Sequence, residues 1–195
     1  MTGSSAAPRI VARDLLLEVS HGADRYGIHA GLDARWGRRG EVGYLWCMGQ
    51  VVGGRAVRVR LPPDHPDGAA GLPIHAPGIG AQLGFRLHAN ITQKDSSSGK
   101  RRSWAREDIA PRLRWLERRG AQHGFRVEHV RAETGRCFIR KGRGFWIDET
   151  QFTGQLSVTD ADAFAAALAG GIGQRGAFGF GLLEIFNPTE PTEAT

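Results

Sequence analysis

The sequence contains seven histidines, and each of them has a side chain that could take part in proton transfer. Residues 24–36 place Ile28 and Leu32 one helical turn apart, which is typical of a helix with an apolar stripe. Tyr26 and His29 are three residues apart, so on this helix they share one side and flank that stripe. Because an imidazole titrates near neutral pH, His29 at the edge of a core could donate or accept a proton.

Other residues compete with this interpretation. A surface histidine with no chemical role is the ordinary state for most of the seven, and His21 and His88 are the main alternatives to His29. Three arginines, Arg35, Arg38 and Arg39, lie at the end of this predicted helix or just after it. They could stabilise negative charge on a bound group, although a solvated basic turn is the more ordinary interpretation.

A second candidate feature is the glycine-rich string of residues 170–183, GGIGQRGAFGFGLL. Gly171, Gly173 and Gly176 match the dinucleotide-binding spacing GxGxxG, but that motif follows a strand and opens a helix. Here the string follows a predicted helix and precedes a predicted strand, so we do not expect a dinucleotide. Because few side chains intervene, its backbone amides can approach phosphates closely, and Arg175 adds positive charge.

Metal and cofactor sites are not expected. Cys47 and Cys137 lack the paired spacing of a zinc site and are predicted to be reduced core thiols, and no Asp, Glu, His or Cys set shows metal-ligand spacing. No apolar run approaches the roughly 18 residues of a membrane span. Residues 1–8 lack an apolar signal core, so we expect a cytoplasmic protein with no membrane partner.

The charge is concentrated in one part of the chain. Of 26 basic residues 23 are arginine, and the formal net charge is +6. Residues 100–143 hold 14 basic and 5 acidic side chains, a local charge of +9, whereas the remainder carries −3. Such asymmetry favours a polyanionic partner, and RNA, DNA and an acidic membrane surface all qualify.

The predicted elements form two similar halves. The first half shows a strand at 10–20, a helix at 24–36, a hairpin over 42–61 and a strand at 83–92. The Ser-rich stretch 94–102 has the composition of a linker, so we place a domain boundary at residue 94, between domains 1–94 and 95–195.

The second half is predicted to contain a helix over 106–119 that ends at Gly120. It also shows strands at 125–134, 137–140 and 152–158, a helix capped by residues 159–162 and a strand at 178–186. The economical fold class is therefore α+β, with two tandem ferredoxin-like (RRM-like) domains.

Basic side chains of the second half are the candidate residues for binding a polyanion such as RNA. On a helix, Arg112 and Arg119 lie beside the apolar stripe, although a charged run is often only a solvated face. The candidates are Lys100, Arg101, Arg102, Arg112, Arg119, Arg136, Arg140, Lys141, Arg143, Gly171, Gly173 and Arg175. Trp104, Trp115 and Trp146 could stack on bases, and a core role for Trp115 is at least as plausible.

Four segments in order resemble a known family. The C-terminal GIGxxxAFGxGLL resembles the signature of the repeat-associated RNA-binding superfamily, and its spacing is most similar to the CasE branch. Residues 24–29 resemble its Tyr-x-x-His helix, residues 83–90 its FRLRAN strand and residues 109–120 its helix ending in WLxRxG. The chain departs from the family in having about eight residues before the first strand and Ile91 where proline is common.

The resemblance implies a metal-independent endoribonuclease that processes precursor crRNA in the CRISPR system. Cleavage would use the RNA's own 2′-hydroxyl and leave a cyclic phosphate and a 5′-hydroxyl. His29 would be the general acid or base, and Tyr26 would orient the 2′-hydroxyl or the phosphate. The partners implied are precursor and mature crRNA, bound at the repeat hairpin, and the other subunits of the Cascade complex. No cofactor is implied.

Two alternatives remain open. One is a non-catalytic RNA-binding structural subunit of the same fold. The other is a small metabolic enzyme with an anion-binding glycine loop, against which the local charge and the lack of a cofactor-type βαβ unit argue.

Overall fold

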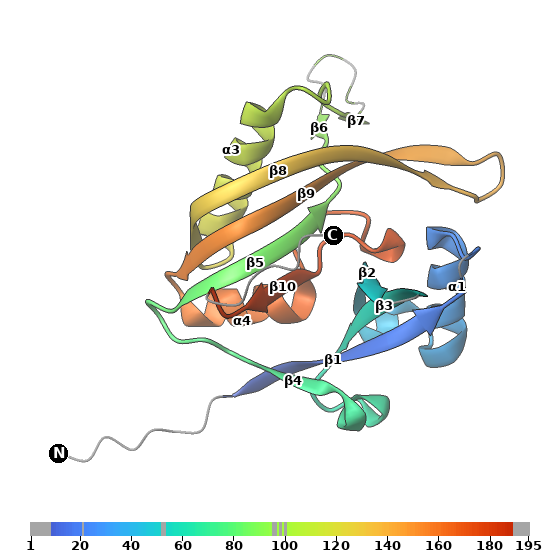
Figure 1. Cartoon of the computed structure of the whole chain (residues 1–195), viewed down its shortest axis with the longest axis horizontal. Helices are drawn as coiled ribbons and strands as arrows, with labels where there is room; N and C mark the ends of the chain where they lie inside the picture. The colour runs from blue at the N-terminus through green and yellow to red at the C-terminus, as the bar shows by residue number, and fades with distance from the viewer. Residues whose placement is uncertain are drawn as a thin grey trace.

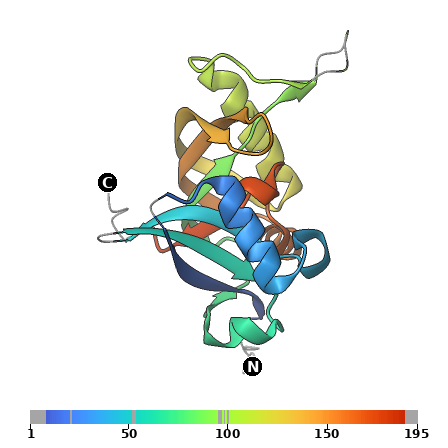
Figure 2. The ribbon, with the colours of Figure 1, turned by 90° about the vertical axis from the view of Figure 1, so that its right-hand side faces the viewer.

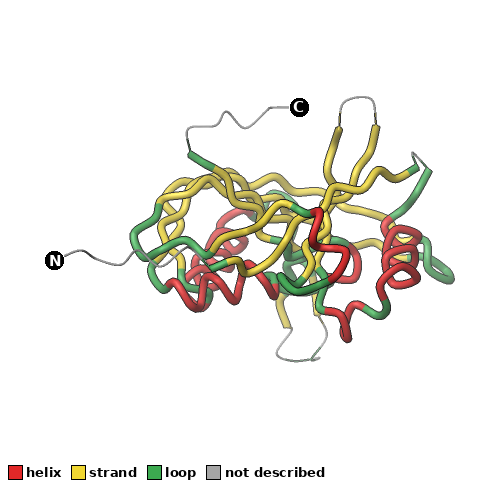
Figure 3. The backbone as a smooth tube through the Cα atoms, turned by 90° about the horizontal axis from the view of Figure 1, so that it is seen from below, coloured by secondary structure: helices red, strands yellow, loops and turns green. Residues whose placement is uncertain are grey.

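The computed structural model describes residues 9–20, 22–51, 54–94, 97, 99 and 101–188. Within these residues, the strands form two four-stranded antiparallel sheets and one two-stranded sheet (Figure 1). In the backbone view from below, the strands run along the molecule and the helices lie beside them (Figure 3). No helix among the described residues is long and apolar enough to cross a membrane.

The first sheet has the strand order β2-β3-β1-β4. Its elements are β1 (Ile10–Val19), α1 (Arg25–Trp36), α2 (Arg39–Val42), β2 (Leu45–Val51), β3 (Gly54–Leu61), the 3-10 helix η1 (Pro66–Ala70) and β4 (Leu72–His75). This is the ferredoxin-like order with η1 in place of the second helix. Ile28 and Leu32 of α1 pack on Trp46, Val57 and Val59 of the sheet, so the apolar stripe seen in the sequence holds the helix.

The second sheet has the order β10-β5-β9-β8. Its elements are β5 (Gln82–Ala89), α3 (Ile109–Gln122), β8 (Phe125–Ile139), β9 (Phe145–Val158), α4 (Ala161–Gly170) and β10 (Leu183–Phe186). The short strands β6 (Gln93–Lys94) and β7 (Arg101–Arg102) pair with each other before α3. The β-α-β-β-α-β order confirms the predicted α+β class and the two ferredoxin-like units.

One strand was assigned to the wrong sheet. The strand expected to complete the first half, β5, pairs with β9 and β10 instead. Its inward residues Phe85 and Leu87 pack against α3 and α4, and alternation alone cannot say which of two sheets a strand joins. The chain thus passes from the first sheet to the second after β4, before residue 94. The domain boundary expected at residue 94 stays a prediction about how the chain divides into folding units.

The end of α3 also differs from the prediction. The helix continues past Gly120 to Gln122, and the left-handed residue beyond it is Gly124, with φ +73°. Gly120 is needed inside the helix because a Cβ there would lie 2.7 Å from the carbonyl oxygen of Phe125. Close packing between the helix and the strand, and not the end of the helix, therefore explains glycine at residue 120.

The two strands β8 and β9 form a hairpin of 15 and 14 residues that extends beyond the rest of its sheet to α1 (Figure 1). The sequence predicted shorter, separate strands, because Gly135 interrupts the apolar alternation. The last strand, predicted over residues 178–186, is by contrast shorter than expected, because η2 (Gly176–Phe178) precedes it and β10 begins only at Leu183.

A buried arginine joins the two units. Arg60 of β3 binds Asp14 through two contacts of 2.7 and 2.8 Å and donates to the carbonyl oxygens of Leu168 and Leu183 at 3.1 and 2.8 Å. In the ribbon view of Figure 2, α1 lies in front of the first sheet and the second sheet lies above them. The joint holds α1 near the glycine-rich loop.

Candidate active site

Helix α1 holds Tyr26 and His29 at the edge of the core. Asp24 caps the helix by accepting a hydrogen bond from the Gly27 amide at 2.9 Å, and Ile28 is buried beneath it. Tyr26 and His29 are half-buried and flank the apolar stripe, as the spacing predicted. Their roles in chemistry stay a prediction.

The His29 imidazole lies between a carboxylate, a phenol and an aromatic ring. Its Nε2 atom is 3.6 Å from Oδ2 of Asp33, and its Nδ1 atom is 3.5 Å from the Tyr44 hydroxyl. The ring of Phe178 meets it edge-on at 6.1 Å between centroids. The side chain keeps 20% of its surface exposed, so a ligand can reach it.

Asp33 organises this cluster. Its Oδ1 atom accepts hydrogen bonds from the Tyr44 hydroxyl at 2.5 Å and from the Arg39 amide at 3.0 Å. Burial, together with the hydrogen bond to Asp33, raises the pKa of Tyr44 well above its usual range, so the phenol stays a donor. Tyr44 escaped the sequence reasoning because it stands outside the helix and its neighbours are apolar.

Arg39 lies against the glycine-rich loop. A Cβ on Gly176 would lie 2.5 Å from Nη2 of Arg39, so only glycine lets the guanidinium approach this closely. Its Nε atom is buried without a hydrogen-bond partner among the described residues. Burial lowers the pKa of Arg39, and Tyr44 and Asp33 oppose that effect. Arg35 and Arg38, its two alternatives in sequence, are exposed.

Arg25 fastens the glycine-rich loop to α1. Its guanidinium donates to the carbonyl oxygens of Phe178 and Gly179 at 2.9 and 3.3 Å and forms an ion pair with Glu149 of β9 at 2.8 Å. His88 contacts the same Glu149 oxygen at 3.0 Å. His88 therefore belongs to this structural network, whereas His21, the other alternative, lies outside the described residues.

Burial alone would raise the pKa of Glu149. The hydrogen bond to His88 and the charge of Arg25 outweigh it and hold that pKa below its ordinary value. Glu149 is therefore ionised at neutral pH and attaches the loop to β9 through Arg25.

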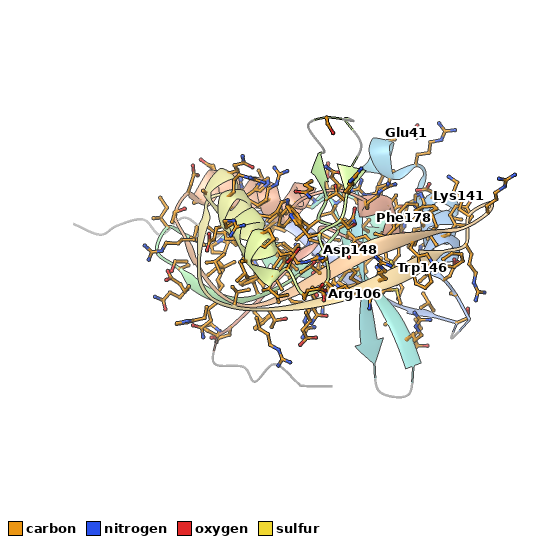
Figure 4. The ribbon with its side chains drawn as sticks, turned by 90° about the horizontal axis from the view of Figure 1, so that it is seen from above. Glu41, Arg106, Lys141, Trp146, Asp148 and Phe178 are labelled. Atoms are coloured by element: carbon orange, nitrogen blue, oxygen red, sulfur yellow. The ribbon has the colours of Figure 1, made fainter. Side chains whose placement is uncertain are left out.

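The tip of the β8–β9 hairpin reaches the start of α1. The Arg140 amide donates to Oδ2 of Asp24 at 3.0 Å, and the Lys141 ammonium lies 5.5 Å from the centre of the Tyr26 ring. Arg140, Lys141 and Arg143 are exposed. Figure 4 shows Lys141 near the end of this hairpin and Phe178 behind it. The hairpin thus brings positive charge to the side of α1 that carries Tyr26.

The other candidate RNA-binding residues are dispersed. Arg136 and Arg175 are exposed, and Arg175 adopts the left-handed conformation, with φ 64°. Arg102 is exposed, the Arg101 side chain is not described and Lys100 lies outside the described residues.

Three of these candidates have contacts within the protein. Gly171 and Gly173 are explained by packing against Gly181 and Trp115, where a Cβ would lie 2.9 and 3.3 Å from the nearest atom. Arg119 donates to Gln122 on the same helix at 2.9 Å.

Arg112 is not a surface residue, contrary to the prediction. It is completely buried and forms an ion pair with Asp148 at 2.8 Å, besides a hydrogen bond to Thr150 at 2.5 Å. Its other amino group donates to the carbonyl oxygens of Trp104 and Ala105. The helical spacing placed Arg112 beside the apolar stripe, but that side of α3 faces the sheet. Both amino groups of Arg112 are bonded inside the protein and the side chain is buried, so it is not available to RNA.

The described residues contain no group of three or more His, Cys, Asp or Glu side chains that could hold a metal ion. The geometry thus joins an imidazole, a phenol, a half-buried guanidinium and a basic hairpin tip around one glycine-rich loop. Such a set can transfer a proton and hold an anion at one place.

Comparison with known proteins identifies the family. A sequence profile of the CRISPR associated protein family matches residues 77–186. The structure is similar to that of Thermus thermophilus Cse3 bound to an RNA representing a pre-cleavage complex, with a TM-score of 0.75, 26% identity and coverage of 90% of this chain and 99% of that one.

Two further structures share this fold. The CRISPR endoribonuclease Cse3 bound to a 19-nucleotide RNA gives a TM-score of 0.75 at 25% identity, with 91% and 100% coverage. Escherichia coli Cas6e shares the fold, with a TM-score of 0.65, 23% identity and coverage of 91% and 100%. No curated protein sequence matches. The chain therefore belongs to the CRISPR associated protein family.

Proposed function

We propose that this chain is a metal-independent endoribonuclease that cleaves precursor crRNA at a repeat hairpin and keeps the product within Cascade. One observation carries the proposal. The side of α1 that bears Tyr26 and His29 is where the glycine-rich loop and the basic hairpin tip meet. The similarity to Cse3 structures with bound RNA supports the same conclusion.

The proposed reaction is an attack by the 2′-oxygen on the adjacent phosphorus. A new phosphorus–oxygen bond forms, the bond to the 5′-oxygen breaks, and the products are a 2′,3′-cyclic phosphate and a 5′-hydroxyl. The 2′-hydroxyl loses a proton to a base, and the departing 5′-oxygen takes a proton from an acid. His29 performs one of these transfers, and Tyr26 orients the 2′-hydroxyl or the phosphate.

Asp33 and Arg39 complete this proposal. Asp33, held by Tyr44 and by the Arg39 amide, keeps the His29 ring in one orientation. The half-buried Arg39 guanidinium beside Gly176 can bind the non-bridging phosphate oxygens through its amino groups as these oxygens gain charge. It neither gains nor loses a proton.

RNA docking is assigned to the exposed cations that surround this site. Arg140, Lys141 and Arg143 extend from the hairpin tip, and Arg175 stands in the glycine-rich loop. Because the major groove of A-form RNA is too narrow for most side chains, we expect recognition of stem shape and phosphates.

The test is single-turnover cleavage of a labelled RNA transcribed from the CRISPR repeat of the encoding genome, with chelator present. We expect His29→Ala to slow cleavage about 10²–10⁴-fold while binding changes little, because proton transfer contributes to rate and not to ground-state affinity. His129→Ala, an exposed histidine on β8, is the matched control. RNA binding without cutting by the wild type would instead support the non-catalytic subunit.

A further inference from the structure

The outer part of the β8–β9 hairpin has an unusual composition. Residues 134–147, TGRCFIRKGRGFWI, contain four basic and no acidic side chains, and aromatic residues are interleaved with them. Basic and aromatic side chains together are typical of surfaces that bind single-stranded nucleic acid. The two faces of the hairpin use these residues differently.

One face anchors the hairpin to the rest of the molecule. Ile139 and Ile147 are buried with Phe178 and Phe180 from the glycine-rich loop region, and Phe145 packs against the same cluster. This contact supplies the packing that fixes the hairpin. The opposite face is not needed for that purpose.

The opposite face carries two exposed rings. Phe138 and Trp146 are cross-strand partners, with ring centroids 5.2 Å apart and planes tilted by 55°. They keep 42% and 64% of their surface exposed, which places them among the few large apolar side chains that the described residues leave in solvent. Figure 4 shows Trp146 along the hairpin, beyond the end of α3.

The turn at the tip holds the Phe138 ring in place. Gly144 has φ +71°, and a Cβ there would lie 2.2 Å from the end of that ring. A side chain at residue 144 would therefore expel Phe138 from its position. The Phe138 ring thus packs against the turn, and a side chain that is already packed loses less entropy on binding.

The charge beside the rings is positive. Arg136 is exposed and lies two residues from Phe138 along β8, hence on the same face of the strand. The acidic residue opposite Arg136 is Asp148, whose charge is buried and paired with Arg112. Arg136 therefore remains available to a phosphate group.

We propose that Trp146 and Phe138 form a stacking platform for an unpaired nucleobase of the bound RNA, with Arg136 contacting its phosphate; this rests on the proposed function. Two rings match the size of a base but are small for a protein interface, which buries about 800 Å² on each partner. Stacking on aromatic side chains accepts any base, so the platform would hold an unpaired flank of the repeat hairpin without reading its sequence.

The experiment uses the repeat RNA with 2-aminopurine placed singly at each unpaired position beside the stem. A 2′-deoxy sugar before the scissile phosphate prevents cutting. Stacking quenches 2-aminopurine fluorescence, so saturating wild-type protein should quench at least one position. Trp146→Ala should abolish that quenching and weaken binding on the order of tenfold, whereas Trp146→Phe should retain most of both.

The control is Leu72→Ala, which removes a side chain 70% exposed on β4, away from the hairpin. Unchanged quenching and affinity in Trp146→Ala would overturn the platform while leaving the proposed nuclease intact. The same result is expected if Phe138 and Trp146 bind a protein partner and not RNA. A wild-type chain that fails to bind the repeat RNA would refute the proposed function and the platform with it. Trp146 is exposed, so thermal unfolding should show that Trp146→Ala folds normally.

Discussion

Replacing Arg39 with alanine is expected to slow RNA cleavage much more than it weakens RNA binding. The guanidinium lies on Gly176, beside the Asp33 carboxylate that contacts His29. The variant keeps the main-chain amide that binds Asp33, so the cluster around His29 should stay in place. What is lost is a cation positioned for the phosphate oxygens.

The magnitude follows from charge and burial. A guanidinium about 4 Å from a phosphorane that gains one negative charge stabilises it by about 4 kcal/mol at an effective dielectric constant of about 20. Because Arg39 is only half-buried, solvent screening reduces this figure. We expect a loss of about 2–3 kcal/mol, which corresponds to a rate lowered about 30- to 150-fold.

The assay is single-turnover cleavage at saturating protein, with affinity measured separately on the uncleavable 2′-deoxy RNA. Arg39→Lys should fall between wild type and alanine, because it keeps the charge but not the planar fork. Arg38→Ala is the matched control, since Arg38 is the adjacent arginine and is exposed. The reasoning is refuted if Arg39→Ala cleaves at the wild-type rate, or if Arg38→Ala loses as much.

Three further predictions concern stability and binding. Arg112→Met leaves Asp148 buried without its cation and should lower the free energy of unfolding by about 3–5 kcal/mol, which corresponds to a Tm lower by about 6–20 °C. Arg114→Met, on the exposed side of α3, should change the Tm little. Equal Tm values for the two variants would contradict this prediction. The pKa of Glu149 is held below its usual 4.5, so its carboxylate stabilises the fold at neutral pH and that contribution is lost as pH falls through the folded-state pKa. Denaturant unfolding between about pH 6 and about pH 3 should therefore show a smaller loss of stability in Glu149→Gln than in wild type, and equal losses would remove Glu149 from the network. Arg140→Ala and Arg175→Ala should each flatten the dependence of log affinity on log salt by about 1, with Arg9→Ala unchanged as the control; parental slopes in both would show that RNA docks elsewhere.

The sequence predicted the local elements better than their assembly. The α1 stripe of Ile28 and Leu32, the hairpin of β2 and β3 and the α4 start at Asp160 follow from spacing and capping, which act within a few residues. The placement of β5 in the second sheet depends on which hydrophobic core its inward side chains join, and a local sequence pattern does not predict which core that is.

The site shows the same division. Tyr26 and His29 could be predicted as neighbours because they share one helix, and their role stays a prediction, whereas Tyr44 and the loop contact of Arg39 come from segments that only the fold brings together. Arg112 was misplaced because helical spacing locates a residue beside the apolar stripe but does not say how far the sheet extends over it.

The most direct test of the central claim replaces a single oxygen in the RNA. Repeat hairpins with a 2′-hydroxyl or a 2′-deoxy sugar on the nucleotide before the cut are incubated with the wild-type chain in chelator, and the product ends are analysed. The account predicts that only the 2′-hydroxyl RNA is cut, leaving a cyclic phosphate and a 5′-hydroxyl, while both RNAs bind equally. Cleavage of the deoxy RNA, or activity that appears only when a divalent metal is added, would contradict it.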